Sequence, residues 1–206
     1  WMIIDLGQSD VVVSIANSLS MILVALTLPV LGDWSDWKGK KLVPLFVFTA
    51  LCVAGTAMLG VLHDILTTGP VLVAAAIGMY MVANYSFQGG LVFYNALLPA
   101  VSIPRSLGRV SGYGVAMGYL GAIIGLLGAQ AFVEGSVFGL DIPFLTAGGT
   151  EASFLPTAVL FLLFALPIFI FVRDPHIRHQ EGSWTVAKSY RKVFKTLRDT
   201  RQHRGL

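Results

Sequence analysis

The sequence predicts an all-α fold, a polytopic transmembrane helical bundle, and three observations predict it. Hydrophobic residues make up 55% of the chain and charged residues only 12%, whereas an ordinary soluble domain has about 25% charged residues. Apolar stretches of the length that a bilayer requires recur between residues 11 and 172. The segments between these stretches alternate between basic and acidic. A soluble protein has no physical reason to segregate its charges in this way.

All 14 Lys and Arg residues lie in segments that share one side of the membrane when the apolar stretches are taken as spans. They occupy residues 33–41, 99–110 and 173–206. The alternate segments, which contain Asp or Glu but no Lys or Arg, are residues 1–10, 63–69 and 134–152. Cytoplasmic loops accumulate Lys and Arg. We therefore expect an integral, multi-pass membrane protein with a cytoplasmic C-terminal tail, in the plasma (inner) membrane if bacterial and the vacuolar membrane if fungal.

Five spans are predicted, because each apolar stretch reaches the roughly 20 residues needed to cross the hydrocarbon layer as a helix. They are helices at about 11–31, 42–62, 71–98, 111–133 and 153–172. Residues 135–152, rich in Gly and poor in charge, predict an outer loop. Residues 1–175 then form the transmembrane bundle and 176–206 a basic cytoplasmic linker. Five spans place the two ends on opposite sides, so we expect a fragment that lacks its first helix.

The third span is the most polar. Asn84, Gln88, Leu91 and Asn95 are spaced four, three and four residues apart and therefore share one helical face, with Tyr94 beside it. Polar groups at membrane depth tend to face a bundle interior or a wet cavity. The alternative is interhelical hydrogen bonding, worth about 0.6 kcal/mol on average. On the cavity reading, Asn84, Gln88, Tyr94 and Asn95 line a substrate path.

The fourth span carries glycines spaced four, three, four and three residues apart, which lie on one stripe. They are Gly114, Gly118, Gly121, Gly125 and Gly128. Small residues at this spacing let a second helix approach closely in a membrane. We expect a helix-packing surface, and a smooth surface of this kind also permits sliding between helices.

The most specific local pattern follows the first span, at Gly32-Asp33-Trp34-Ser35-Asp36-Trp37-Lys38-Gly39-Lys40-Lys41. Its glycines are expected to permit a sharp turn at the membrane surface. Asp36 is expected near the positive N-terminus of a neighbouring helix. The lysines are expected to pair with carboxylates or lipid headgroups.

This run resembles the loop between the second and third helices of major facilitator superfamily transporters, G-x-x-[AS]-D-[RK]-x-G-[RK]-[RK]. The matching positions are Gly32, Ser35, Asp36, Gly39, Lys40 and Lys41. Trp37 stands where the family usually has a basic residue, with Lys38 beside it. Residues 93–99, 110–121 and 171–175 are similar to the vacuole-effluxer-like branch, the autophagy-related amino-acid effluxers.

The resemblance implies the N-terminal half of a secondary transporter, with the five spans as the second to sixth of twelve helices. Alternating access would move a small polar solute, with amino acids as the solutes of fungal relatives. Arg105, Arg109 and the Asp36 loop would form the cytoplasmic gate. The implied partners are the lipid bilayer, the solute and the C-terminal half of the same transporter.

Other function classes find less support in the sequence. The basic residues flank spans, so no nucleic-acid partner is expected. Cys52 is the sole cysteine and the histidines lack a metal-ligand spacing, so we expect no metal site, no cofactor and no catalytic residues. A membrane-embedded enzyme would need a base beside Ser35 and Asp36, and no His is near. A non-transporting receptor or scaffold remains the alternative to a transporter.

The tail combines basic residues with an apolar spacing of four, three and four at Val186, Tyr190, Val193 and Leu197. Two interpretations stay open: an amphipathic helix lying on the cytoplasmic headgroups, or a solvated linker helix.

Overall fold

The computed structural model describes residues 7–66, 69–103, 105–143, 145–174 and 184–202. The expected boundary between bundle and linker, at residue 175, lies outside these ranges. The division of the chain into those two parts therefore stays a prediction.

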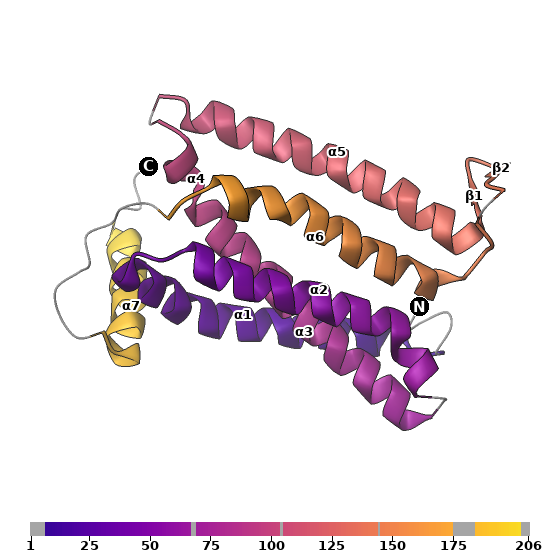
Figure 1. Ribbon diagram of the computed structural model, residues 1–206. Helices are drawn as coiled ribbons and strands as arrows, with labels where there is room; N and C mark the ends of the chain where they lie inside the picture. The colour runs from indigo at the N-terminus through magenta and orange to yellow at the C-terminus, as the bar shows by residue number, and fades with distance from the viewer. Residues whose placement is uncertain (1–6, 67–68, 104, 144, 175–183, 203–206) are drawn as a thin grey trace.

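Five helical stretches are long and apolar enough to cross a membrane, which confirms the predicted all-α bundle (Figure 1). They are α1 (Asp10–Lys38), α2 (Leu42–Ile65), α3 (Pro70–Ala96), α5 (Leu107–Glu134) and the stretch Thr150–Phe171, in which the 3-10 helix η1 (Thr150–Ser153) leads into α6 (Phe154–Phe171). Two further helices, α4 (Leu98–Val101) and α7 (Val186–Gln202), lie outside the spans.

A short antiparallel hairpin follows α5, within the segment expected to be an outer loop. Its strands are β1 (Ser136–Val137) and β2 (Leu140–Asp141), paired in the register Ser136 to Asp141. Phe138 and Gly139 form the turn with φ of 52° and 78°, the positive values that two-residue hairpin turns require. This hairpin could not be predicted from the sequence, because Phe is an unusual residue at a positive φ.

The first span is longer than predicted. Residues 33–38, expected in a loop, continue α1 as a helix, and only Gly39, Lys40 and Lys41 separate α1 from α2. A run of charged residues does not by itself end a helix, because these side chains are well solvated where the helix leaves the hydrocarbon. At 1.5 Å per residue the 29-residue α1 is about 43 Å long, which exceeds a hydrocarbon layer of about 30 Å.

The buried core lies where α3 packs against α1 and α2, and it has two clusters. One contains Leu28, Leu45, Phe48, Phe93 and Leu97, and the other Leu59, Leu62, Leu72 and Ala76. Gly89 makes the first cluster possible, because a Cβ at this position would lie 2.5 Å from the Phe48 ring. The ring instead stacks on Phe93 with centroids 5.7 Å apart. This contact sets the spacing between α2 and α3.

The described Lys and Arg residues gather at one end of the bundle, which we call the basic end. It contains the turn between α1 and α2, the helix α4 with the start of α5, the end of α6 and all of α7 (Figure 1). The hairpin and the first residues of α1 and α6 lie at the opposite end. The alternation of charge along the sequence therefore corresponds to two ends of one bundle.

Candidate functional site

Helices α3 and α1 meet at a seam with two side-chain hydrogen bonds, one from Asn84 on the predicted polar face and one from Tyr85 outside that face. Asn84 Nδ2 donates to Asn17 Oδ1 at 2.9 Å. The Tyr85 hydroxyl lies 2.8 Å from Thr27 Oγ1. Because the Thr27 hydroxyl donates to the Leu23 carbonyl, the Tyr85 hydroxyl is left as the donor. These bonds fix how the two helices face each other.

The other predicted path residues are placed differently from Asn84. Gln88 is half-buried, while Asn95 and Tyr94 are exposed, Tyr94 to 50%. Among the described residues, Gln88 and Asn95 have no side-chain hydrogen-bond partner. The Tyr94 hydroxyl oxygen lies 3.9 Å from where a Cβ at Gly114 of α5 would be. On this face Asn84 is therefore bonded to α1, whereas Gln88 and Asn95 have no hydrogen-bond partner among the described side chains.

Three residues of this seam were not predicted from the sequence, namely Asn17, Thr27 and Tyr85. Asn17 could have been predicted as a member of the seam. Burying its amide inside an apolar span costs as much free energy in α1 as burying the Asn84 amide does in α3. The hydroxyl-bearing residues carry a weaker signal, because Ser and Thr can bond to their own helix and Tyr is often found in cores.

The turn between α1 and α2 is closed by reciprocal bonds between Ser35 and Lys40. The Ser35 hydroxyl, whose residue is only 1% exposed, donates to the Lys40 carbonyl at 2.9 Å, and the Lys40 N–H donates to the Ser35 carbonyl at 3.3 Å. Gly39 lies between them with φ of 66° and ψ of 19°. A glycine adopts this left-handed conformation without a steric penalty, and the bonding pattern is that of a Schellman cap.

Gly32, the other glycine expected to shape the turn, has a different place. It lies inside α1, and a Cβ at this position would meet no described atom within 4 Å. One glycine of the motif is therefore required by the turn conformation and the other is not.

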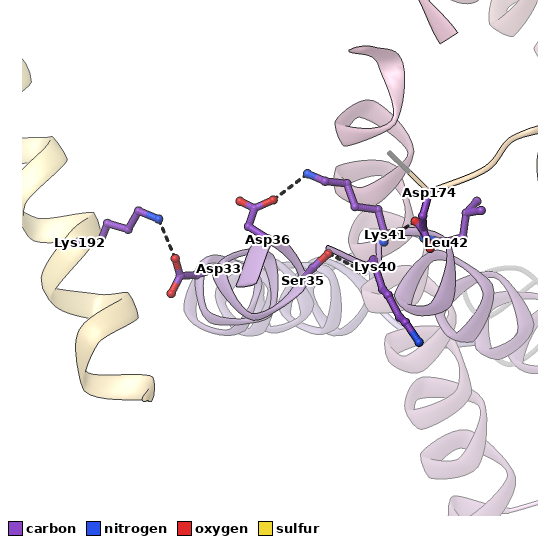
Figure 2. Close-up of polar contacts among 8 residues, drawn as sticks. All are labelled: Asp33, Ser35, Asp36, Lys40, Lys41, Leu42, Asp174 and Lys192. Carbon is purple, nitrogen blue, oxygen red and sulfur yellow. Dashed lines mark hydrogen bonds and ion pairs between the residues drawn. The ribbon is translucent and has the colours of Figure 1, made fainter. Parts of the chain in front are cut away.

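Two carboxylates hold the turn from either side (Figure 2). Asp36 Oδ1 pairs with Lys41 Nζ at 2.7 Å. Asp174, just past α6, accepts at Oδ1 from the backbone N–H groups of Lys41 at 2.7 Å and Leu42 at 2.8 Å. Asp36 therefore lies beside the N-terminus of α2 through the Lys41 side chain, whereas Asp174 is the carboxylate that accepts the N–H groups there. Helices α1, α2 and α6 thus meet at Lys41.

The remaining basic residues of the predicted gate are spread over the basic end. Lys38 Nζ lies 4.9 Å from the centre of the Trp34 ring, within cation–π distance. Arg105 lies between α4 and α5 and Arg109 in the first turn of α5, and both are exposed. Among the described residues neither arginine forms an ion pair. The structure therefore does not bring them to Asp36.

A second acidic residue of the motif, Asp33, binds α7. Its Oδ2 accepts from the Ser189 hydroxyl at 2.7 Å and its Oδ1 from Lys192 Nζ at 2.8 Å. The Tyr190 hydroxyl donates to the Leu26 carbonyl of α1 at 2.6 Å. The hydrogen bond to Asp33 is the main reason that the pKa of Lys192 is raised above its usual value. No local sequence pattern predicts this contact, which joins residues more than 150 positions apart.

The glycine stripe of α5 is largely uncovered. A Cβ at Gly118, Gly121 or Gly125 would meet no described atom within 4 Å, whereas Gly128 lies near Leu160 of α6. Within the described ranges, no helix packs on the middle of the stripe. Described neighbours approach the two ends of the stripe, Tyr94 at Gly114 and Leu160 at Gly128, and packing along its middle stays a prediction.

Nothing in the described part of the chain resembles a metal site, since no group of three His, Cys, Asp or Glu side chains converges there. An open groove runs along the N-terminal half of α1 and is lined by Asp10, Ser14, Ser18 and apolar neighbours. It contains none of the predicted site residues.

Comparison with known proteins gives one informative similarity. The chain is 27% identical over 213 residues to the Uncharacterized MFS-type transporter YxiO of Bacillus subtilis (strain 168). The match covers 98% of this chain but 46% of that protein, so the chain spans about half the length of this relative. No family model and no solved structure matches. The chain, with its five apolar helices, is therefore similar over nearly its whole length to about half of an MFS-type membrane transporter.

Proposed function

We propose that this chain forms the N-terminal half of a secondary active transporter, which moves a small polar solute across the membrane by alternating access. The observation that carries this proposal is the similarity of nearly the whole chain to about half of an MFS-type transporter. Transporters of this superfamily consist of two six-helix halves with substrate bound between them near the bilayer midplane. In this proposal the five spans are the second to sixth helices, and the C-terminal half of the protein is the main partner.

The solute class follows from the α3 face. Gln88, Asn95 and Tyr94 offer hydrogen-bond donors and acceptors without a fixed charge, which suits a neutral or zwitterionic ligand. The similarity of residues 93–99 and 110–121 to the vacuole-effluxer-like branch makes amino acids the first solutes to test. Asn84 would position the face through its bond to Asn17.

The basic end supplies the proposed gate. Asp36, Lys41 and Asp174 connect α1, α2 and α6 at one point, so these helices would move as a unit when the transporter changes state. Arg105 and Arg109 are exposed at the same end. We propose that they pair with acidic groups of the other half in one state and separate in the next. The basic end would face the cytoplasm, in accordance with the positive-inside rule.

Transport by the full-length protein in liposomes tests the proposal. A panel of radiolabelled amino acids and neutral polar solutes should include at least one whose uptake is saturable and far above that of protein-free vesicles. Absence of flux for every member of the panel, from correctly folded protein in both orientations, would contradict a transporter of small polar solutes.

The Gln88→Ala variant tests the site separately. We expect the apparent KM for the transported solute to rise several-fold. The amount of folded protein should be unchanged, because no described side chain forms a hydrogen bond with Gln88. Gln130→Ala is the matched control, since Gln130 is also a half-buried amide of a span but bonds to Glu134 near the end of α5. Equal KM values for the Gln88 variant and the wild type would exclude Gln88 from the path.

A further inference from the structure

The helix α7 lies beside the last turns of α1 and not beyond its end. Tyr190 bonds to the carbonyl of Leu26, a residue that precedes the end of α1 at Lys38 by about 18 Å at 1.5 Å per residue. Ser189 and Lys192 bond to Asp33, two turns further along. Figure 1 shows α7 running across the direction of the spans at this level.

The sequence of α1 gives the depth of this contact in a bilayer. The apolar stretch of α1 ends at Leu31, and Asp33 is its first charged residue after Asp10. Asp33 therefore lies where hydrocarbon gives way to headgroups, and Leu26 lies just inside the hydrocarbon edge. A helix that crosses the spans between these two levels lies in the plane of the interface.

The side chains of α7 fall into three sectors around the helix axis. Ser189, which is 1% exposed, faces α1. The cations Arg191, Lys195 and Arg198 are spaced four and three residues apart, so they form one stripe on the side opposite Ser189, and all are exposed. Phe194, which is 68% exposed, lies in the sector between Ser189 and the cationic stripe. An uncovered aromatic side chain beside a cationic stripe is costly in water and favourable at a membrane surface.

We propose that α7 is an interfacial helix that binds acidic phospholipid headgroups in the leaflet at the basic end. Arg191, Lys195 and Arg198 would bind the lipid phosphates, because arginine and lysine are attracted to anionic headgroups and guanidinium groups bond to phosphate in a bidentate manner. Phe194 would enter the boundary with the acyl chains. The bonds to Asp33 and Leu26 would hold the helix at the required depth. This proposal depends on the membrane placement of the spans and not on which solute is moved.

Site-specific quenching of a fluorophore tests the proposal in the full-length protein. Phe194→Cys is labelled with an environment-sensitive dye after Cys52, buried in α2, is replaced by Ala along with any cysteine outside this chain. The protein is placed in zwitterionic vesicles that contain a small fraction of phosphatidylglycerol or phosphatidylcholine with a nitroxide near the headgroup. We expect phosphatidylglycerol to quench at a mole fraction about three- to tenfold lower, and this preference to weaken at high salt.

Charge reversal identifies the residues responsible. Arg191→Glu, Lys195→Glu and Arg198→Glu combined should remove the preference for phosphatidylglycerol, and the three Gln substitutions should do the same if the Glu variant fails to fold. Arg173→Glu, at an exposed cation outside α7, should retain it. The proposal is overturned by any of three results: no quenching by either lipid, equal quenching by both in the unmodified helix, or a preference that survives both combined variants.

Discussion

Asp174 and Lys41 are 133 positions apart in the chain, yet the carboxylate of Asp174 accepts the backbone N–H of Lys41 at 2.7 Å (Figure 2). The same oxygen accepts the N–H of Leu42 at 2.8 Å. The first N–H groups of a helix have no partner within it and carry a partial positive charge. Asp174 therefore satisfies the start of α2 from the end of α6. Because the Lys41 ammonium also pairs with Asp36, one residue connects three helices.

We expect Asp174→Ala to lower the free energy of unfolding by about 1 kcal/mol, the usual cost of losing an N-terminal cap. Asp174→Asn should cost less, because the amide oxygen still accepts a hydrogen bond. Thermal unfolding of the purified protein measures both. Arg173→Ala is the control, since Arg173 is adjacent and exposed. An unchanged melting temperature for Asp174→Ala would show that the cap adds nothing to stability.

The two glycines of the motif after α1 should respond in opposite ways to the same change. Gly39→Ala places a Cβ in a left-handed conformation, at a cost of about 1 kcal/mol. Gly32→Ala lies in a helix with open space around it, so stability should be unchanged or higher by up to about 1 kcal/mol. Denaturant or thermal unfolding of the two variants in one detergent compares them. Equal destabilisation by both would contradict the assignment of the turn to Gly39 alone.

The spans could be predicted because hydropathy and length are local properties of the sequence. The helical state of residues 33–38 could not, because those charged residues are compatible with a loop and with an overhanging helix alike. The cap that Asp174 provides for α2 could not be predicted either, because it depends on how α6 packs against α2, which no local pattern encodes. Likewise, the polar face of α3 could be predicted from the spacing of its residues. That Asn17 of α1 bonds to Asn84 could not, because it depends on how α1 is rotated about its own axis.

The contact between Asn17 and Asn84 should be measurable as a coupling energy. Because single polar bonds between membrane helices contribute about 0.6 kcal/mol on average, we expect a double-mutant cycle with Asn17→Ala and Asn84→Ala to give a value of this order. The Gln88→Ala and Asn17→Ala pair is the reference, since Gln88 has no described bond to Asn17 and should show additivity. If the changes in the free energy of unfolding for Asn17→Ala and Asn84→Ala are additive, their hydrogen bond does not stabilise the packing of α1 against α3.

The glycine stripe of α5 makes a prediction about the full-length protein. A Cβ added at Gly121 would meet no described atom within 4 Å, so the described chain leaves room at the start of a side chain there. If the stripe packs against a helix outside this chain, Gly121→Leu will push that helix away and should reduce the transport rate by about tenfold or more, with a lower melting temperature. Gly78→Leu on α3 is the control, because Gly78 is also an uncovered glycine of a span but lies off the stripe. Wild-type transport and stability in the Gly121 variant would place the stripe against lipid, where a leucine is as well accommodated as a glycine.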